Sequence, residues 1–412
     1  MAQMSQMVSS RKLEVVIAVI VVILDQVTKA MVRPALALHE SREVIPGFLD
    51  LTRVLAGPWA CQMLADLGAE VIKIERPGSG DDTRAWGPPY MRDGEGRETT
   101  ESSYFTSCNR GKKSVTLDIS RAEGQALARQ LALESDVLIE NYKVGDLRRY
   151  GLGYEDLKVL NPGLVYCSIT GFGQDGPYSR RPGYDFLVQG MGGFMSITGE
   201  ADDQPGGGPQ KGGVAVTDLM TGMYATVAIL AALAHRDRTG EGQYIDMALL
   251  DSGVGMLANM HLYYFATGQS PGRWGNAHPS IVPYQVFPCA DGHVILAAGN
   301  DSQFRKFCEV AGRVEWADDE RFATNAARVR NRAVLVPMIE AVMRTRRRDD
   351  WVSALEGASV PSGPINSIAQ VFEDPQVQHR GMRVEAPHPL AGRVSMVRNP
   401  IRLSATPLTH AV

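Results

Sequence analysis

Short apolar runs and amphipathic segments alternate through most of the chain, and this alternation predicts its secondary structure. Runs rich in β-branched residues predict strands at Leu49–Leu55, Glu70–Glu75, Ser114–Asp118, Asp136–Glu140, Leu164–Thr170 and Tyr244–Leu250. Apolar residues at helical spacing predict helices between them, at Trp59–Leu67 and Arg121–Ser135. Such alternation favours an α/β fold with a mainly parallel, Rossmann-like sheet. No GxGxxG motif follows the first strand, which argues against dinucleotide binding.

The later part of the chain has a different pattern, in which neighbouring strands pair with each other. Tyr284–Pro288 and His293–Ala298 flank an Ala-Asp-Gly turn and predict a hairpin. Further predictions are helices at Asp251–Thr267, Ser302–Ala311, Arg332–Arg344 and Asp349–Leu355, a turn at Pro361–Pro364, and a β-rich stretch over Met382–Leu403. We therefore expect a large α/β domain at 48–268, a small α+β domain at 269–378 and a C-terminal return segment at 379–412.

Residues 1–47 differ in pattern from the rest of the chain. Val15–Leu24 is a continuous apolar run that is too short to span a bilayer unaided, and Asp25 ends it. Residues 12–50 resemble the first membrane helix and following loop of bacterial lipoprotein signal peptidases, without the aspartates that do that family's chemistry. We interpret residues 1–47 as a foreign-looking extension and expect no peptidase activity from it. Any membrane contact would be made through residues 13–32.

One helix, Leu219–His235, is almost free of charge, and Asp218 lies where the preceding Gly/Pro-rich loop becomes that helix. Thr217 is the expected N-cap, which places Asp218 in the first turn. Free N–H groups and the helix dipole there favour an anion, so we expect Asp218 to stay ionised and to be able to act as a nucleophile. The alternative is that Asp218 only caps a core helix.

Composition and charge exclude several classes of function. The 412 residues carry a net charge of −4 without a basic stripe, so no nucleic-acid partner is expected. Five scattered cysteines indicate reduced thiols in a cytoplasmic protein, and eight dispersed histidines predict no metal site. Several cations follow predicted strands, where open α/β sheets bind ligands. Two interpretations of these cations are open: they contact a phosphate-bearing ligand, or they are ordinary surface charges. The cations are Lys73, Arg76, Arg84, Arg110, Lys112 and Lys113.

Motifs spread over residues 49–405 carry a specific resemblance. The chain resembles the class III CoA-transferases, the CaiB/BaiF family, in the segments LDLTRVLAGPWACQMLADLGAEVIKIERPGSGDDTR, YFTSCNRGKKSVTLDI, ENYKVGDLRRYGLGYEDL, RPGYDFLVQGMGG and TDLMTGMYA. The resemblance implies a covalent role for Asp218, coenzyme A as acyl-CoA substrate without a permanently bound cofactor, and an interlocked homodimer. The CoA contacts it implies are Arg76, Leu117, Asp118, Ile119, Ser120, Asn141, Tyr142, Lys143, Arg149, Pro182, Gly183, Tyr184 and Asp185.

The same superfamily contains α-methylacyl-CoA racemases, which use a His where this chain has Tyr184. Without that base the resemblance favours a transferase, with a racemase-like isomerase or an inactive CoA-binding protein as alternatives. RWGNAHPSIVPYQVF resembles the branch that acts on succinate, glutarate and related dicarboxylates, which implies acceptor contacts at Arg273, Gly275 and His278. The start of the Asp218 helix and the loop at Gly275 are the expected N–H donors to oxyanions. Family members continue with a further segment beyond the position of Val412.

Overall fold

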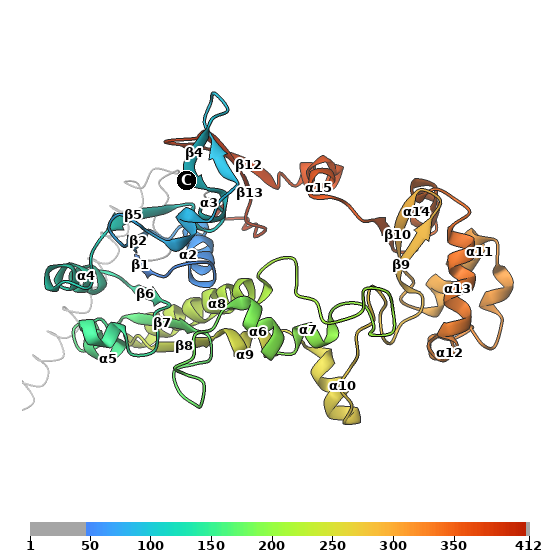
Figure 1. The fold of residues 1–412 in the computed structure, drawn as a ribbon, viewed down its shortest axis with the longest axis horizontal. Helices are drawn as coiled ribbons and strands as arrows, with labels where there is room; N and C mark the ends of the chain where they lie inside the picture. The colour runs from blue at the N-terminus through green and yellow to red at the C-terminus, as the bar shows by residue number, and fades with distance from the viewer. Residues whose placement is uncertain (1–46, 409–412) are drawn as a thin grey trace, which may run out of the picture. The chain divides into compact units, whose positions relative to one another are not determined.

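A six-stranded parallel sheet organises the larger part of the computed structural model, which describes residues 47–408 (Figure 1). The strand order is β5-β2-β1-β6-β7-β8. These strands are β1 (Phe48–Leu51), β2 (Val71–Glu75), β5 (Lys112–Thr116), β6 (Val137–Glu140), β7 (Val165–Thr170) and β8 (Tyr244–Ala248). All five neighbouring pairs are parallel, which confirms the expected α/β fold.

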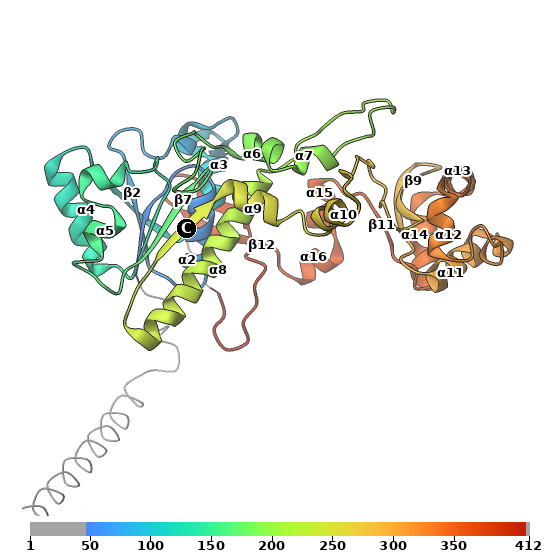
Figure 2. The same ribbon diagram turned by 90° about the horizontal axis from the view of Figure 1, so that it is seen from below.

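Helices cover both faces of this sheet because its strands place apolar side chains alternately on each face (Figure 2). Val137 and Ile139 pack in one core with α2 (Ala56–Asp66) and α8 (Val216–Thr239), whereas Leu138 belongs to a second core. α4 (Ala122–Glu134) and α5 (Tyr154–Leu157) contribute to that second core. Helices α2 and α8 approach closely at Gly222, where a Cβ atom would lie 2.7 Å from the Ala56 carbonyl oxygen.

The order of the strands defines where a ligand can enter. From β1 the chain continues outward through β2 to β5, and from β6 it continues in the opposite direction through β7 to β8. The segments that leave β1 and β6 therefore diverge above the sheet and leave a crevice between them. Open α/β sheets bind ligands in this crevice, at the carboxyl ends of the strands. Arg53 and Asn141 follow β1 and β6 at this point.

A separate hydrophobic core lies in the region that follows the large sheet. Antiparallel strands β9 (Tyr284–Cys289), β10 (Gly292–Ala297) and β11 (Ser362–Pro364) form a small sheet, so the predicted hairpin is confirmed. The core also contains side chains of α11 (Asp301–Ala311), η3 (Val314–Ala317), α12 (Asn325–Arg330), α13 (Arg332–Met343) and α14 (Arg348–Gly357). The turn predicted at Pro361–Pro364 is instead mostly strand, because Ser362–Pro364 pairs with β10.

The last elements are α15 (Ile368–Glu373), α16 (Pro375–His379) and the hairpin of β12 (Arg383–His388) with β13 (Gly392–Val397). The hairpin packs against Met91 of β3 (Tyr90–Arg92), the partner of β4 (Glu98–Ser102). Asn399 donates to Asp66 of α2 at 3.0 Å, and Arg110 donates to the Val397 carbonyl at 3.2 Å. These contacts attach the C-terminal strands to the large sheet's helices.

Three further predicted elements differ from the structure. The first strand ends at Leu51, and the helix predicted to start at Trp59 starts at Ala56. The helix predicted at Asp251–Thr267 is divided into α9 (Leu249–Gly255) and α10 (Asn259–Thr267), because Ala258 has a φ of +46°, outside the helical region. The predicted apolar run of Val15–Leu24 and the extension over residues 1–46 lie outside the described residues.

Within residues 47–408, α8 is the one helix long and apolar enough to meet the criteria for a membrane span. It nevertheless buries Ala225, Ile229 and Ala232 in the sheet's core, as a core helix does. Length and composition alone therefore do not make α8 a membrane segment.

Candidate active site

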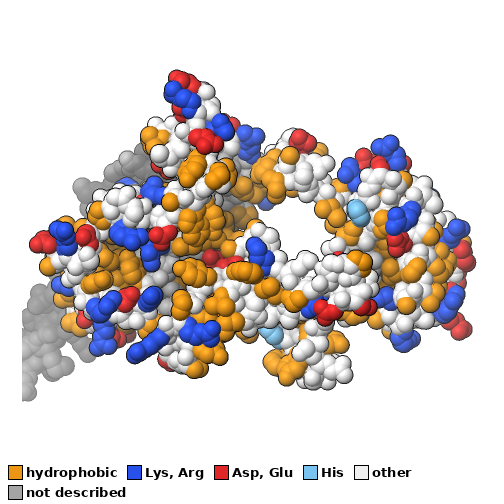
Figure 3. Space-filling model, viewed as in Figure 1, with side chains coloured by type: hydrophobic (Ala, Val, Ile, Leu, Met, Phe, Trp, Pro, Cys, Tyr) orange, Lys and Arg blue, Asp and Glu red, His pale blue; other side chains and the backbone are white. Residues whose placement is uncertain are grey.

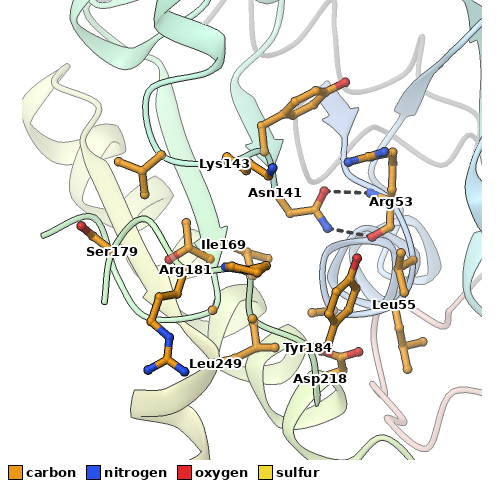
Figure 4. Close-up of a pocket in the computed structure, with 18 of the residues that line it drawn as sticks. Arg53, Leu55, Asn141, Lys143, Ile169, Ser179, Arg181, Tyr184, Asp218 and Leu249 are labelled. Atoms are coloured by element: carbon orange, nitrogen blue, oxygen red, sulfur yellow. Dashed lines mark hydrogen bonds between the residues drawn. The ribbon is translucent and has the colours of Figure 1, made fainter. Parts of the chain in front are cut away.

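Two cavities lie along the carboxyl edge of the large sheet, on either side of the β1–β6 crevice. The first, which we call the Asp218 cavity, measures about 220 Å³. It is lined by segments Arg53–Ala56, Asn141–Val144, Ile169–Gly171 and Ser179–Tyr184, together with Asp82, Asp218 and Leu249 (Figure 4). The second, the Ser120 cavity, also measures about 220 Å³. It is lined by Thr52, Arg53, Lys73–Arg76, Gly80, Asp81, Leu117–Ser120, Tyr142 and Tyr150.

A two-way hydrogen bond joins the loops that follow β1 and β6. The Arg53 backbone N–H donates to Asn141 Oδ1 at 2.9 Å, and Asn141 Nδ2 donates to the Arg53 carbonyl at 2.7 Å (Figure 4). The amide of Asn141 thus satisfies both backbone groups of a residue that is 88 positions away. This connection holds both cavity walls in a single arrangement.

Two glycines bring a third loop to the same edge. A Cβ atom on Gly171, which follows β7, would lie 2.5 Å from the Gly183 Cα atom. A Cβ atom on Gly183 would lie 2.4 Å from the Gly171 Cα atom, so neither position accepts a larger residue. The backbone contact places Pro182–Tyr184 over the end of β7, beside Asp218.

Asp218 lies in the first turn of α8, as predicted, and is 9% exposed. The N-cap position is Ala215, not Thr217, and no side chain at that position caps the helix. Asp185, the first residue of α6 (Asp185–Met191), replaces the cap: its Oδ1 accepts from the Thr217 N–H at 2.8 Å and the Asp218 N–H at 3.3 Å. These N–H groups are therefore occupied, which corrects the expectation that they bind an oxyanion.

The protonation of Asp218 also differs from the prediction. Burial, together with the negative charge of Asp185, raises the pKa of this carboxyl to about 7. No ion pair to Asp218 exists within residues 47–408 to offset these effects. A large fraction of the group is thus protonated at neutral pH, and its anion is a stronger base than an ordinary aspartate.

The residues with implied CoA contacts divide between the two cavities. The Asp218 cavity is lined by Asn141, Tyr142, Lys143, Pro182, Gly183 and Tyr184. The Ser120 cavity is lined by Arg76, Leu117, Asp118, Ile119, Ser120 and Tyr142. Arg149 and Asp185 line neither cavity. Arg149 pairs with Asp146 at 2.7 Å and lies over the ring of Tyr150, a residue of the Ser120 cavity. Eleven of the thirteen residues are thus brought together at the sheet's carboxyl edge.

The implied acceptor residues lie elsewhere in the chain, on a loop beside Glu200. Arg273 donates to the Glu200 carbonyl at 3.1 Å and forms an ion pair with Asp202. The Gly275 N–H donates to the Gly199 carbonyl at 3.0 Å, and His278 Nδ1 accepts from the Ser280 N–H at 3.0 Å. Arg273 lines a different cavity, with Glu200 and Trp274, and Asp218 is not part of it. The acceptor role of these three residues stays a prediction.

Most of the cations proposed as phosphate contacts serve a structural purpose instead. Lys73 pairs with Asp81 at 3.0 Å, Lys112 with Asp50 at 3.0 Å, Arg84 with Glu75 at 2.7 Å, Arg110 with Asp66 at 2.5 Å, and Lys113 with Glu70. Lys73, Lys112 and Arg110 are also buried, so an anion in solvent cannot reach them without displacing these carboxylates. Arg76 differs because its side chain is exposed and lines the Ser120 cavity.

Two residues near the site were not predicted from the sequence. Arg53 lines both cavities, and no motif distinguishes it from other arginines. Tyr104, on α3 (Ser103–Asn109), has a pKa raised to about 12 by burial and by the charges of Asp218 and Asp185. Both are brought to Asp218 by tertiary contacts across more than a hundred residues, which local patterns do not reveal.

A metal-dependent site finds no support in the described residues, where no three His, Cys, Asp or Glu side chains form a metal-binding group. All five cysteines are unpaired and buried. The Asp218 cavity places the carboxyl of Asp218 beside walls that carry guanidinium, ammonium and amide groups.

The fold and this site define an α/β protein that holds a buried carboxyl in a cavity at the carboxyl edge of a parallel sheet. The sequence matches CoA-transferase family III over residues 48–411, and the chain belongs to that family. It is 53% identical to a succinate–glutarate CoA-transferase of Agrobacterium fabrum over 88% of this chain and 89% of that protein. A succinyl-CoA:glutarate CoA-transferase of Mus musculus is 46% identical over 88% of this chain and 81% of that protein.

Solved structures agree with this assignment. A CaiB/BaiF family protein from Brucella suis has a TM-score of 0.78 and 52% identity, and the match covers 89% of this chain and 93% of that one. Rv3272 from M. tuberculosis has a TM-score of 0.76 and 30% identity, with 89% and 93% covered. The chain is therefore a class III CoA-transferase, and acyl-CoA thioesters and carboxylic acids are its substrates.

Proposed function

We propose that this chain transfers CoA from succinyl-CoA to a dicarboxylate acceptor, glutarate foremost, through a covalent intermediate on Asp218. The observation that carries the proposal is the position of Asp218, a buried carboxyl in the cavity that also contains six of the implied CoA contacts. The similarity to the succinate–glutarate enzymes of Agrobacterium fabrum and mouse supports the choice of substrates.

The reaction exchanges one acyl bond for another in four steps. The Asp218 carboxylate attacks the succinyl thioester carbonyl, which breaks the C–S bond and gives a mixed anhydride and CoA thiolate. The thiolate then attacks the Asp218 carbonyl, forms an aspartyl-CoA thioester and releases succinate. Glutarate attacks this thioester to give a glutaryl–aspartyl anhydride and CoA thiolate. The thiolate finally attacks the glutaryl carbonyl, which releases glutaryl-CoA and restores the Asp218 carboxylate.

The surroundings of Asp218 suit this chemistry. Burial removes water that would hydrolyse the anhydride, and the raised pKa of Asp218 makes its anion a better nucleophile than a solvated aspartate. Each tetrahedral oxyanion needs donors, and removing one donor of this kind costs roughly 3–4 kcal/mol in other enzymes. Asp185 occupies the first N–H groups of α8, and the Gly275 N–H donates to the Gly199 carbonyl, so both expected donors are already paired in this arrangement.

The direct test is Asp218→Ala, assayed for glutaryl-CoA formation from succinyl-CoA and glutarate. Turnover should be lost, and hydroxylamine should trap a modified Asp218 in the unaltered protein, identified by peptide mass spectrometry. Asp237→Ala, at the far end of the same helix, is the matched control and should keep its turnover. Near-normal activity of Asp218→Ala would refute the mechanism.

The same assay separates the alternatives. Exchange of the α-proton for deuterium without transfer to glutarate would identify a racemase-like isomerase. Tight binding of CoA without any turnover would identify a CoA-binding protein. Neither result is expected, because Tyr184 supplies no imidazole at the position where the family's racemases have one.

We include a homodimer in the proposal. Helix α8 exposes Met223, Tyr224, Val227 and Leu230, and Val227 is 62% exposed. Hydrophobic side chains gather over α2 and α8 on the face shown in Figure 3. A second copy of the chain would cover such a surface, and Val227→Glu should then give a monomer by light scattering. The buried, unpaired thiols support a cytoplasmic location, which cell fractionation tests.

A further inference from the structure

Arg53 connects the two cavities. It follows β1 at the switch point of the sheet, and it lines both the Asp218 cavity and the Ser120 cavity. A ligand that reaches from Ser120 to Asp218 must therefore pass this side chain. Coenzyme A is such a ligand, because its nucleotide end is anionic and its thiol end must meet the nucleophile.

The backbone at Arg53 is held more firmly than that of an ordinary loop. Both of its backbone polar groups bond to the Asn141 side chain, as described above. The next residue, Val54, has a φ of +71°, a left-handed conformation that a β-branched residue rarely adopts. Strained backbone of this kind is retained mainly where it supports function, which connects the conformation at Arg53 to the site.

The guanidinium group has capacity for a further acceptor. Arg53 Nη1 lies 3.3 Å from Asp82 Oδ2, and the group lies 5.5 Å from the centroid of the Tyr142 ring. Its Nε atom is buried and has no hydrogen-bond partner among the described residues. Buried donors are normally paired, so the unpaired Nε shows that groups of the described residues do not satisfy this guanidinium completely.

The local charge also favours an anion. Asp82 binds Arg76 Nη2 at 3.1 Å through its other oxygen, so one carboxylate is shared by two guanidinium groups. The cluster of Arg53, Asp82 and Arg76 thus carries one excess positive charge at the β1–β6 crevice. Guanidinium groups bind phosphate with two parallel hydrogen bonds, and Arg53 is 39% exposed in its side chain, which leaves it accessible.

We propose that Arg53 is a positioning residue that binds a phosphate group of coenzyme A at the junction of the two cavities and thereby directs the thioester toward Asp218. The role of Arg53 in the reaction rests on the proposed function. Its binding site rests on the two cavities that it lines and on its unpaired Nε atom. It assigns Arg53 to the phosphates and not to the reacting carbonyl.

The experiment compares donors with and without phosphate. For succinyl-CoA, Arg53→Gln should raise KM roughly 10- to 100-fold with little change in kcat, the loss expected for a charged hydrogen bond. For succinyl-pantetheine, which has no phosphate, Arg53→Gln and the unaltered protein should have the same kcat/KM. Arg53→Lys, which keeps the charge without the planar fork, should recover part of the affinity.

Arg92→Gln provides the matched control, because Arg92 is an exposed arginine on β3 that pairs with Glu98 away from both cavities. It should match the unaltered protein with both donors. Calorimetric binding of CoA and of pantetheine repeats the comparison without turnover, so it tests Arg53 even if the proposed reaction fails. Equal losses for both ligands, no loss for either, or a fall in kcat with succinyl-pantetheine would overturn the proposal.

Discussion

Asp50 and Asp218 are both buried acids of the large α/β region, but they have opposite surroundings. Asp50, on β1, is fully buried, with Lys112 Nζ at 3.0 Å and Lys73 Nζ at 3.7 Å from its Oδ2 atom. The Thr52 N–H also donates to it at 2.8 Å. Burial alone would raise the pKa of Asp50, but these cations and hydrogen bonds outweigh it and hold the pKa well below its ordinary value.

Asp218 has the same chemistry and nearly the same burial, and its pKa moves in the other direction. Its nearest charged influence is another carboxylate, Asp185, so burial and repulsion add to raise the pKa to about 7. Glu140, at the end of β6, behaves similarly: burial raises its pKa to about 7 although it accepts from the Tyr142 N–H at 2.6 Å. Partners, not burial, thus decide which acids stabilise the sheet and which remain reactive at its edge.

Removing the charge of Asp50 should produce the largest change in stability. Asp50→Asn leaves Lys73 and Lys112 buried near a neutral amide, and we expect the free energy of unfolding to fall by about 3–5 kcal/mol at pH 7. Because the folded pKa of Asp50 is lowered, its contribution is present above about pH 4 and is lost as the pH falls below that value. Urea unfolding at pH 7 measures the change, and a loss below about 1 kcal/mol would contradict the comparison.

The same substitution at Asp218 should have the opposite sign. The folded pKa of about 7 lies some three pH units above the ordinary value of 3.8, so ionisation destabilises the fold by up to about 4 kcal/mol at pH 8. Asp218→Asn should therefore stabilise the protein at pH 8 by up to that amount, and by almost nothing near pH 4. Equal effects at both pH values would show that the change does not come from the carboxylate charge.

Activity should depend on pH through the same group. Only the Asp218 anion is nucleophilic, so kcat/KM should rise about tenfold per pH unit below pH 7 and level off above it. Glu140→Gln distinguishes the two buried acids with similar pKa values, because it removes one titration and keeps an acceptor for the Tyr142 N–H. An unchanged midpoint in that variant assigns the profile to Asp218, whereas a lost midpoint assigns it to Glu140.

Arg273 pairs with an exposed acid, Asp202, and not with a buried one. Substitution of Arg273 should give the smallest of these effects. If Arg273 binds the distal carboxylate of the acceptor, Arg273→Ala should raise KM for glutarate by roughly one to two orders of magnitude, about 1.5–3 kcal/mol. A monocarboxylate acceptor should be nearly unaffected. Asp202→Asn frees Arg273 from its ion pair and should lower KM for glutarate or leave it unchanged. Equal losses for both acceptor classes in Arg273→Ala would indicate damage to the loop, which also depends on the bond to the Glu200 carbonyl.

Much of the architecture was predictable because it follows from local pattern. Alternation of apolar runs with amphipathic segments predicted the strands of the parallel sheet to within a few residues, since inner strands such as β6 and β7 are buried along almost their whole length. The division near Ala258 was not predictable in this way. The residues on both sides of it have helical character, and only the backbone conformation of Ala258 separates α9 from α10.

The chemistry of the site divides in the same manner. The sequence by itself determined that Asp218 begins a long apolar helix and that the segments with implied CoA contacts follow successive strands, because both depend on neighbours along the chain. Only the tertiary structure decided that Asp185 caps that helix, that Lys73 and Lys112 neutralise Asp50, and that Arg53 lines both cavities. Charges and burial act through space, so the pKa of Asp218 depends on groups that the folded chain brings together from distant positions.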